Sequence, residues 1–376
     1  MTLPSRDFVP TNWIRSIPFH PEKESLEIWT HENHSGRRAL EVRVSFGKKL
    51  DAFSLKQKVV SDFEKSVSEI RRKNETLFAS RNLEEVRGCP ICGEAIAKAV
   101  PAASFYGGTY HHCLRCDHYF VAKRPSQKAL EAFYAKDKTY QSTYADPDLL
   151  KIRLESVAFP KIQWVLREFK TQFQKPPATL LDVGAGSGHM VKASLDLGLK
   201  AEGIELSETG IKFAKSNFGI ELKNLDFVEK GAVLPSYNII TFWGLIEHVP
   251  DPLKMLEMAR NKLKKENGMV VVEVPRWHSL TTEVQKLFNN RIVRHLDPSS
   301  HIHLFSDTSL ANAFVITGLR PVAAWYFGLD AYEAAVQLVR EHGGELEAAA
   351  KYVPYFQTLL DQNRLSDFLV LAGVPE

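Results

Sequence analysis

Residues 180–190 read LLDVGAGSGHM, and this stretch is the strongest indication of the fold in the sequence. An apolar run ends at Asp182, and Gly184, Gly186 and Gly188 then alternate with small residues. Glycine is needed where the backbone takes a positive φ or approaches a ligand closely. Because a helix-compatible run follows, the stretch predicts a buried strand, a tight turn and a helix N-terminus whose free N–H groups face a ligand.

Acidic and aromatic residues follow the next strands at positions suited to a nucleoside. Glu205 ends a second apolar run about 17 residues past the last glycine, where a carboxylate can accept both ribose hydroxyls. Asp226 and Phe227 come next and suit an adenine amino group and ring. The glycine turn alone is a weak signal, because nicotinamide, flavin and S-adenosylmethionine (SAM) sites all use one.

Together these stretches resemble the class I SAM-dependent methyltransferases, through DVGAGSG at 182–188, the acid Glu205 and the EHxxDP segment at 247–252. The resemblance implies an α/β, Rossmann-like fold with a seven-stranded, mostly parallel sheet whose last strand is antiparallel. An ordinary Rossmann turn carrying a nicotinamide or flavin is the alternative. Strands are expected at 179–183, 200–205, about 220–222, 237–243, 268–274, 320–327 and 365–375. The residues that the resemblance places around SAM are Asp182, Gly184, Ala185, Gly186, Gly188, Glu205, Leu206, Asp226, Phe227, Trp243 and Gly244.

Composition sets the broad class of the protein. The chain has 376 residues, enough for two or three domains, and its 44% hydrophobic and 25% charged residues are typical of a globular protein. The net charge of +3 is too small to indicate nucleic acid or a membrane surface by itself. No secretory signal and no apolar run of about 18 residues is found, so a cytoplasmic location without a membrane span is expected.

The four cysteines form two CxxC pairs, with the spacing C-x2-C-x20-C-x2-C. Each pair places two thiolates on one side of a metal, and two pairs complete a tetrahedron. A structural zinc ribbon is therefore predicted, closed to substrate, and no cysteine is left over as a nucleophile. Disulfides do not fit a cytoplasmic chain. The predicted zinc ligands are Cys89, Cys92, Cys113 and Cys116.

The N-terminal region predicts two strands and a long helix. The strands are expected at 25–32 and 38–46 around a turn at 34–36, and an amphipathic helix at about 52–80. The helix either forms a coiled-coil homodimer, with Asn74 fixing the register, or packs on its own chain. Only about three heptads are present, which favours the second interpretation.

The region after the cysteines carries a second resemblance. A zinc ribbon, a helix near 127–135, spaced tyrosines, a class I domain and the FGLD sequence at 327–330 resemble the zinc-ribbon methyltransferases of sugar and surface-polysaccharide pathways. That resemblance implies that Tyr140 and Tyr144 close over the cofactor or acceptor, whereas the alternative is that they only pack two domains together. The expected domains are an α+β region at 1–86, a zinc ribbon at 87–122, a linker at 123–160 and a SAM domain at 161–376, with a helical insertion at about 330–363.

A hydroxyl or carbon acceptor must lose a proton, and histidine is the side chain best matched to that task near neutral pH. Candidates are His248 and three histidines in the segment 295–303. The resemblance makes His301 the best base or acceptor ligand, with His248 and Tyr144 as further catalytic candidates. The His301-Ile302-His303 pair also suggests a metal, but no nearby carboxylate pair supports one.

The sequence therefore predicts a SAM-dependent methyltransferase that modifies O or C of a small molecule, such as a nucleotide sugar or polysaccharide intermediate. An RNA or protein methyltransferase that recruits its substrate through the zinc ribbon is the second hypothesis. A non-catalytic SAM-binding subunit is the third, because related sequences commonly carry an acid where this chain has Gly244. No N-P-P-[YF] run follows the strand at 237–243, which argues against methylation of a base amine.

Overall fold

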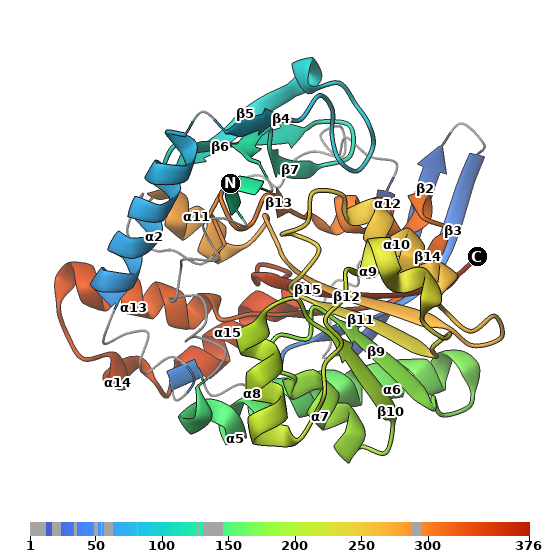
Figure 1. Ribbon diagram of the computed structural model, residues 1–376. Coiled ribbons are helices and arrows are strands. Elements are labelled where there is room, and N and C mark those ends of the chain that lie inside the picture. The colour runs from blue at the N-terminus through green and yellow to red at the C-terminus, as the bar shows by residue number, and fades with distance from the viewer. Residues whose placement is uncertain are drawn as a thin grey trace.

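The computed structural model describes residues 13–16, 24–33, 36–48, 52–53, 55, 63–80, 82–126, 128–130, 146–287 and 295–376. A nine-stranded sheet runs through them in the order β1-β2-β3-β14-β15-β12-β11-β9-β10, with helices on both faces (Figure 1). Its strands are β1 (Trp13–Ser16), β2 (Glu24–Asn33), β3 (Gly36–Phe46), β9 (Thr179–Val183), β10 (Lys200–Ile204), β11 (Ile239–Trp243), β12 (Met269–Pro275), β14 (Leu319–Phe327) and β15 (Phe368–Pro375).

The central part of this sheet is the predicted α/β fold. β9, β10, β11 and β12 are parallel, and β15 is antiparallel to both β12 and β14, so the predicted antiparallel last strand is confirmed. Alternate residues of each strand pack on opposite helical layers, as Leu180 and Leu181 do. The helices of these layers are α6 (Phe159–Phe173) and α7 (His189–Asp196) on one face, and α9 (Phe227–Lys230), α10 (Pro252–Asn261) and α12 (Asp307–Ile316) on the other.

Two details of the sheet differ from the prediction. The strand expected at about 220–222 is reduced to a single parallel bridge between Ile204 and Lys223. α8 (Glu208–Phe218) ends with Gly219 in the left-handed conformation and Asp226 caps α9, so only a short segment lies between the two helices. The expected number of seven strands is therefore wrong for the described residues, since one strand is missing and three N-terminal strands are added.

The predicted N-terminal strands are confirmed as β2 and β3, but they extend the central sheet. β3 pairs parallel with β14, with Ala323 opposite Arg43 and Tyr326 opposite Phe46. Trp29 on β2 is also fully buried. The two strands therefore share one core with the domain expected at 161–376.

The cysteine-rich region forms a second sheet in the order β13-β7-β6-β5. β5 (Ala99–Phe105), β6 (Gly108–Cys113) and β7 (His118–Val121) are consecutive, whereas β13 (His303–Leu304) comes from the far end of the chain. A separate pair joins β4 (Leu83–Glu85) to β8 (Lys123–Pro125). We call residues 88–121 the cysteine module, and β13 ties it to the central domain (Figure 1).

The remaining helices cover the cysteine module and the end of the sheet. α2 (Phe63–Phe78) places Asn74 in a fully buried position, where it hydrogen-bonds Asp297 and Ser299, so this helix packs on its own chain. The predicted helical insertion is confirmed as α13 (Asp330–His342), α14 (Leu346–Ala349) and α15 (Val353–Gln362). Two further helices are α5 (Leu150–Arg153) and α11 (Leu280–Leu287). Within the described residues, no helix has both the length and the apolar character needed to cross a membrane.

Candidate active site

The glycine turn adopts the predicted strand–turn–helix geometry. β9 ends at Val183, Gly184 and Gly186 have φ of +73° and +54°, and Gly188 starts α7 with φ of +80°. A Cβ added at Gly184 would collide with Leu245, whereas a Cβ at Gly186 would meet no atom within 4 Å. The backbone at Gly186 is therefore open on the side where a cofactor would lie.

Glu205 lies directly against this turn. Its Oε2 accepts a hydrogen bond from Gly186 N at 2.6 Å, and its Oε1 accepts bonds from Leu206 N at 2.8 Å and Ser207 N at 2.7 Å. A carboxylate has about four acceptor positions, so capacity remains for a hydroxyl. The Leu206 side chain beside it is 60% exposed. The predicted ribose ligand is thus held at the glycine turn by main-chain donors.

Asp182 is buried at the end of β9, and Thr241 Oγ1 donates a hydrogen bond to its Oδ1 at 2.7 Å. Burial raises the pKa of Asp182 to about 7, Thr241 opposes this shift, and the nearby Glu205 adds to it. A cation bound next to Asp182 would lower that pKa and favour the carboxylate.

The predicted adenine residues make structural contacts within the chain. Asp226 caps α9 by accepting a hydrogen bond from Glu229 N at 2.8 Å. Phe227 is buried and packs edge-on against Phe242, with ring centroids 6.0 Å apart. Their role toward adenine stays a prediction.

A buried ion pair near the end of β11 was missed by the sequence analysis. Lys161 Nζ on α6 lies 2.6 Å from Glu273 Oε2 on β12, and 5.0 Å from the ring centroid of Trp243. Gly244 follows with φ of +63°. The sequence does not distinguish Lys161 from the other charged residues of its amphipathic helix, so its buried position could not be predicted.

Glu247 and His248 follow β11, and His301, from the segment before β13, completes a cluster with them. His248 Nε2 lies 3.8 Å from Glu247 Oε1, and the two imidazole centroids are 4.7 Å apart. Burial lowers the pKa of His248 to about 3 and that of His301 to about 4, so both rings are neutral near pH 7. Burial raises the pKa of Glu247 to about 8. The two predicted histidines are therefore brought together, and Glu247 joins them.

Contacts from distant parts of the chain hold this cluster. His301 N donates to Asp297 O at 2.8 Å, and Tyr110 Oη of the cysteine module donates to His301 O at 2.9 Å. His303 N donates to Glu247 O at 3.1 Å, which ties the two loops together. His303 itself is fully buried, with its ring nitrogens 3.2 Å from His118 Nε2 and 3.0 Å from Val249 O.

His295, another histidine from the expected segment, is buried with Nε2 2.8 Å from Asp367 Oδ2. His295 and His303 are thus structural residues here, and the His301-Ile302-His303 sequence does not act as a pair. The predicted tyrosines Tyr140 and Tyr144 lie outside the described residues, so their role stays a prediction.

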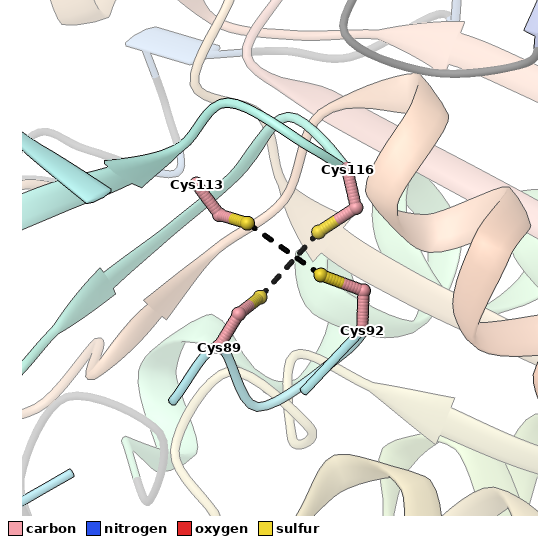
Figure 2. A group of neighbouring side chains, drawn as sticks. All are labelled: Cys89, Cys92, Cys113 and Cys116. Carbon is pink, nitrogen blue, oxygen red and sulfur yellow. Dashed lines mark hydrogen bonds between the residues drawn. The ribbon is translucent and has the colours of Figure 1, made fainter. Parts of the chain in front are cut away.

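The four cysteines converge as the spacing predicts (Figure 2). Cys89 Sγ lies 3.4 Å from Cys116 Sγ, and Cys92 Sγ lies 3.5 Å from Cys113 Sγ. None of them forms a disulfide. A tetrahedral zinc with bonds of about 2.3 Å needs sulfur separations of roughly 3.8 Å, so small side-chain movements would make this set fit the metal.

Comparison with known proteins agrees with this geometry. Residues 155–324 match a family model described as a methyltransferase domain. The ubiquinone biosynthesis O-methyltransferase of Thiobacillus denitrificans is 32% identical over 97 residues, which are 24% of this chain and 41% of that protein. The protein of the same name from Bordetella avium is 24% identical over 208 residues, which are 53% of this chain and 85% of that protein.

A solved SAM-dependent methyltransferase from Archaeoglobus fulgidus is 18% identical, covers 61% of this chain and 99% of that chain, and has a TM-score of 0.39, too low to support further argument. The chain spans less than half the length of the first of the curated relatives. The family match itself covers the glycine turn, Glu205 and the Glu247–His248–His301 cluster. Residues 155–324 are therefore similar to a methyltransferase domain.

Proposed function

We propose that this protein is a SAM-dependent methyltransferase that transfers a methyl group to an oxygen or carbon atom of a small-molecule acceptor. One observation carries the proposal. The open glycine turn, Glu205 and the pair Glu247–His248 follow the carboxyl ends of the parallel strands β9, β10 and β11, and His301, from the segment before β13, lies beside that pair. Ligands of open α/β sheets bind at that end.

Each part of the site has a distinct task in this proposal. The main chain at 184–188 admits the methionine end of SAM, Glu205 holds the ribose, and Asp226 with Phe227 faces the adenine. SAM supplies an activated methyl group on a positive sulfonium. The chain's main task is then to hold the acceptor atom in line with that methyl group.

His301 accepts the acceptor's proton in this proposal. Its Nδ1 lies 2.8 Å from His295 O, and because a carbonyl can only accept, Nδ1 carries the hydrogen. The Nε2 lone pair is then free to take a proton. As the acceptor atom bonds to the methyl carbon, the carbon–sulfur bond breaks and its electron pair stays on sulfur.

The finer assignments rest on resemblance. The zinc-ribbon arrangement supports an acceptor from sugar or polysaccharide metabolism, such as a nucleotide sugar, and a structural zinc on the four cysteines. The relatives named O-methyltransferase support oxygen as the methylated atom.

Calorimetric titration of the purified protein with SAM tests the cofactor assignment. Gly186→Arg fills the open side of the turn and Glu205→Ala removes the ribose ligand, so both should abolish binding. Glu221→Ala is the matched control, because Glu221 is an exposed acid whose only ion pair in the described residues is with Lys215. Failure of the wild type to bind SAM, or binding of NAD instead, would overturn the proposal.

Acceptors are then screened by measuring S-adenosylhomocysteine by mass spectrometry, with nucleotide sugars, phenols and bulk RNA compared directly. His301→Ala should abolish turnover on the acceptor found while leaving SAM affinity unchanged. Equal turnover in the variant would remove His301 from the mechanism.

A further inference from the structure

Three hydrogen-bond acceptors converge where β11 ends. One ligand atom each from Glu247, His248 and His301 lies within 4.8 Å of the others. His248 Nδ1 lies 2.8 Å from Ser300 O, and His301 Nδ1 lies 2.8 Å from His295 O. Because carbonyl oxygens only accept, both Nδ1 atoms carry hydrogen and both Nε2 atoms present lone pairs. Main-chain carbonyls orient metal-binding imidazoles in this way.

The carboxyl group of Glu247 lacks a hydrogen-bonding partner at one of its two oxygens. Glu247 is 2% exposed, and its Oε2 meets no donor among the residues that the structure describes. Leaving a buried acceptor unsatisfied costs about 1–3 kcal/mol. A cation bound between Glu247 and the two imidazole lone pairs would be a partner for all three groups, and its charge would favour the carboxylate form of Glu247.

We propose that Glu247, His248 and His301 bind one divalent transition-metal ion, through a carboxylate oxygen and two Nε2 atoms, and that the acceptor oxygen takes an open coordination position. Two histidines and one carboxylate are a ligand set that leaves positions free for substrate. The four-cysteine set is closed, so the chain would carry two metals with different tasks.

The geometry needs only small changes to reach coordination. Bonds of about 2.1 Å in a tetrahedral site separate ligand atoms by roughly 3.4 Å, so the 3.8 Å between His248 Nε2 and Glu247 Oε1 is already close. Gly244 contributes space, since a Cβ there would lie 3.3 Å from Glu247 Oε1.

The inference deepens the proposed function and rests on it, because it names the acceptor class. With the metal bound, His301 Nε2 is a ligand and no longer the base that accepts the acceptor's proton. An acceptor that binds a cation through oxygen is an alcohol, a phenol or a vicinal diol, and coordination acidifies its hydroxyl. The hydroxyl proton leaves to solvent, the oxygen bonds to the methyl carbon, and the carbon–sulfur bond breaks with its electron pair on sulfur. Methylation of carbon or of an amine is not expected.

Metal stoichiometry tests the inference without knowledge of the acceptor. Metal-free protein is loaded with one equivalent of Zn²⁺, then with excess Co²⁺, desalted, and analysed by mass spectrometry of the elements and by visible absorption. The expected result is one Zn²⁺ and one Co²⁺ per chain, with the weak absorption of a nitrogen and oxygen site. Cys92→Ser should retain the Co²⁺ of the second site.

His301→Ala and Glu247→Gln should each lose the Co²⁺. Their Co²⁺ affinity should fall by more than the roughly 10–100-fold expected for loss of an outer hydrogen-bond partner. His342→Ala is the matched control, since His342 lies exposed at the end of α13. Near-ultraviolet circular dichroism checks that the variants are folded.

One metal per chain in the wild type, or a second metal that persists in His301→Ala, would overturn the inference. SAM calorimetry on the same samples separates this failure from that of the proposed function. If the protein binds SAM but only one metal, the second metal site is rejected, and the methyltransferase proposal stands with His301 as the base. Two metals without SAM binding would instead reject the methyltransferase proposal.

Discussion

Replacing Asn74 with alanine should destabilise the loop that carries His301, although Asn74 lies far from it in sequence. Asn74 Nδ2 donates to Asp297 Oδ1 at 2.8 Å, and its Oδ1 accepts from Ser299 N at 3.0 Å. A hydrogen bond to a charged group contributes about 1.5–3 kcal/mol and a neutral one about 1 kcal/mol. Alanine has a higher helix propensity than asparagine, which offsets roughly 0.5 kcal/mol of this loss in the free energy of unfolding. The expected loss in the free energy of unfolding is therefore about 2–3.5 kcal/mol.

Urea titration measures this loss, with tryptophan fluorescence and far-ultraviolet circular dichroism as probes that must coincide. Thr76→Ala is the control, because Thr76 is an exposed residue of the same helix whose hydroxyl donates to Arg72 O within that helix. Asn74→Ala should also shift the NMR signals of the His301 ring while leaving SAM affinity unchanged. A loss no larger than that of Thr76→Ala would refute the view that α2 supports the active-site loop.

Three further changes test other parts of the structure. Cys92→Ser should release zinc to a chromophoric chelator and lower the unfolding temperature, because metal binding contributes folding free energy; unchanged zinc affinity would argue against a four-cysteine site. Burial raises the pKa of Asp361 to about 8, so the folded state holds a proton that the unfolded state has lost above about pH 4. Stability therefore falls as the pH rises toward 8, and Asp361→Asn should melt higher than the wild type at about pH 9 but not at about pH 4. Lys161→Met leaves Glu273 buried without its ion partner and should cost about 3–5 kcal/mol in urea titration, most of which the double variant with Glu273→Leu should restore.

The parts of the fold that depend on local chemistry could be predicted from the sequence. The glycine turn needs a positive φ at specific positions, and Glu205 follows its strand at a fixed spacing. Both features can therefore be located from the sequence alone. The two CxxC pairs likewise define their own turns. Apolar runs located most strands of the parallel sheet, but the run at 220–222 was too short to compete with the adjacent helices.

The arrangement of the active site depends on contacts that no local pattern encodes. Glu247 and His301 come together only because the segment after His301 pairs with β7 and His303 N bonds Glu247 O. The His301-Ile302-His303 sequence suggests a pair of metal ligands. In the structure, the ring of His301 contacts His295 O, whereas that of His303 contacts Val249 O. The position of Asn74 in an apolar helix face suggests a residue that fixes the register of a coiled coil. Nothing near it in the sequence identifies Asp297 as its hydrogen-bonding partner.

The parallel pairing of β3 with β14 has a consequence for any attempt to study the region similar to a methyltransferase domain alone. In the whole chain, β3 satisfies the outer main-chain groups of β14, and Trp325 Nε1 donates to Gly47 O at 2.8 Å. A fragment starting near residue 150 would leave β14 as a bare, apolar edge strand. Such an edge is a template for pairing with other chains. The fragment should therefore self-associate through β14. In the whole chain, β2 and β3 cover this edge and so reduce the tendency to aggregate.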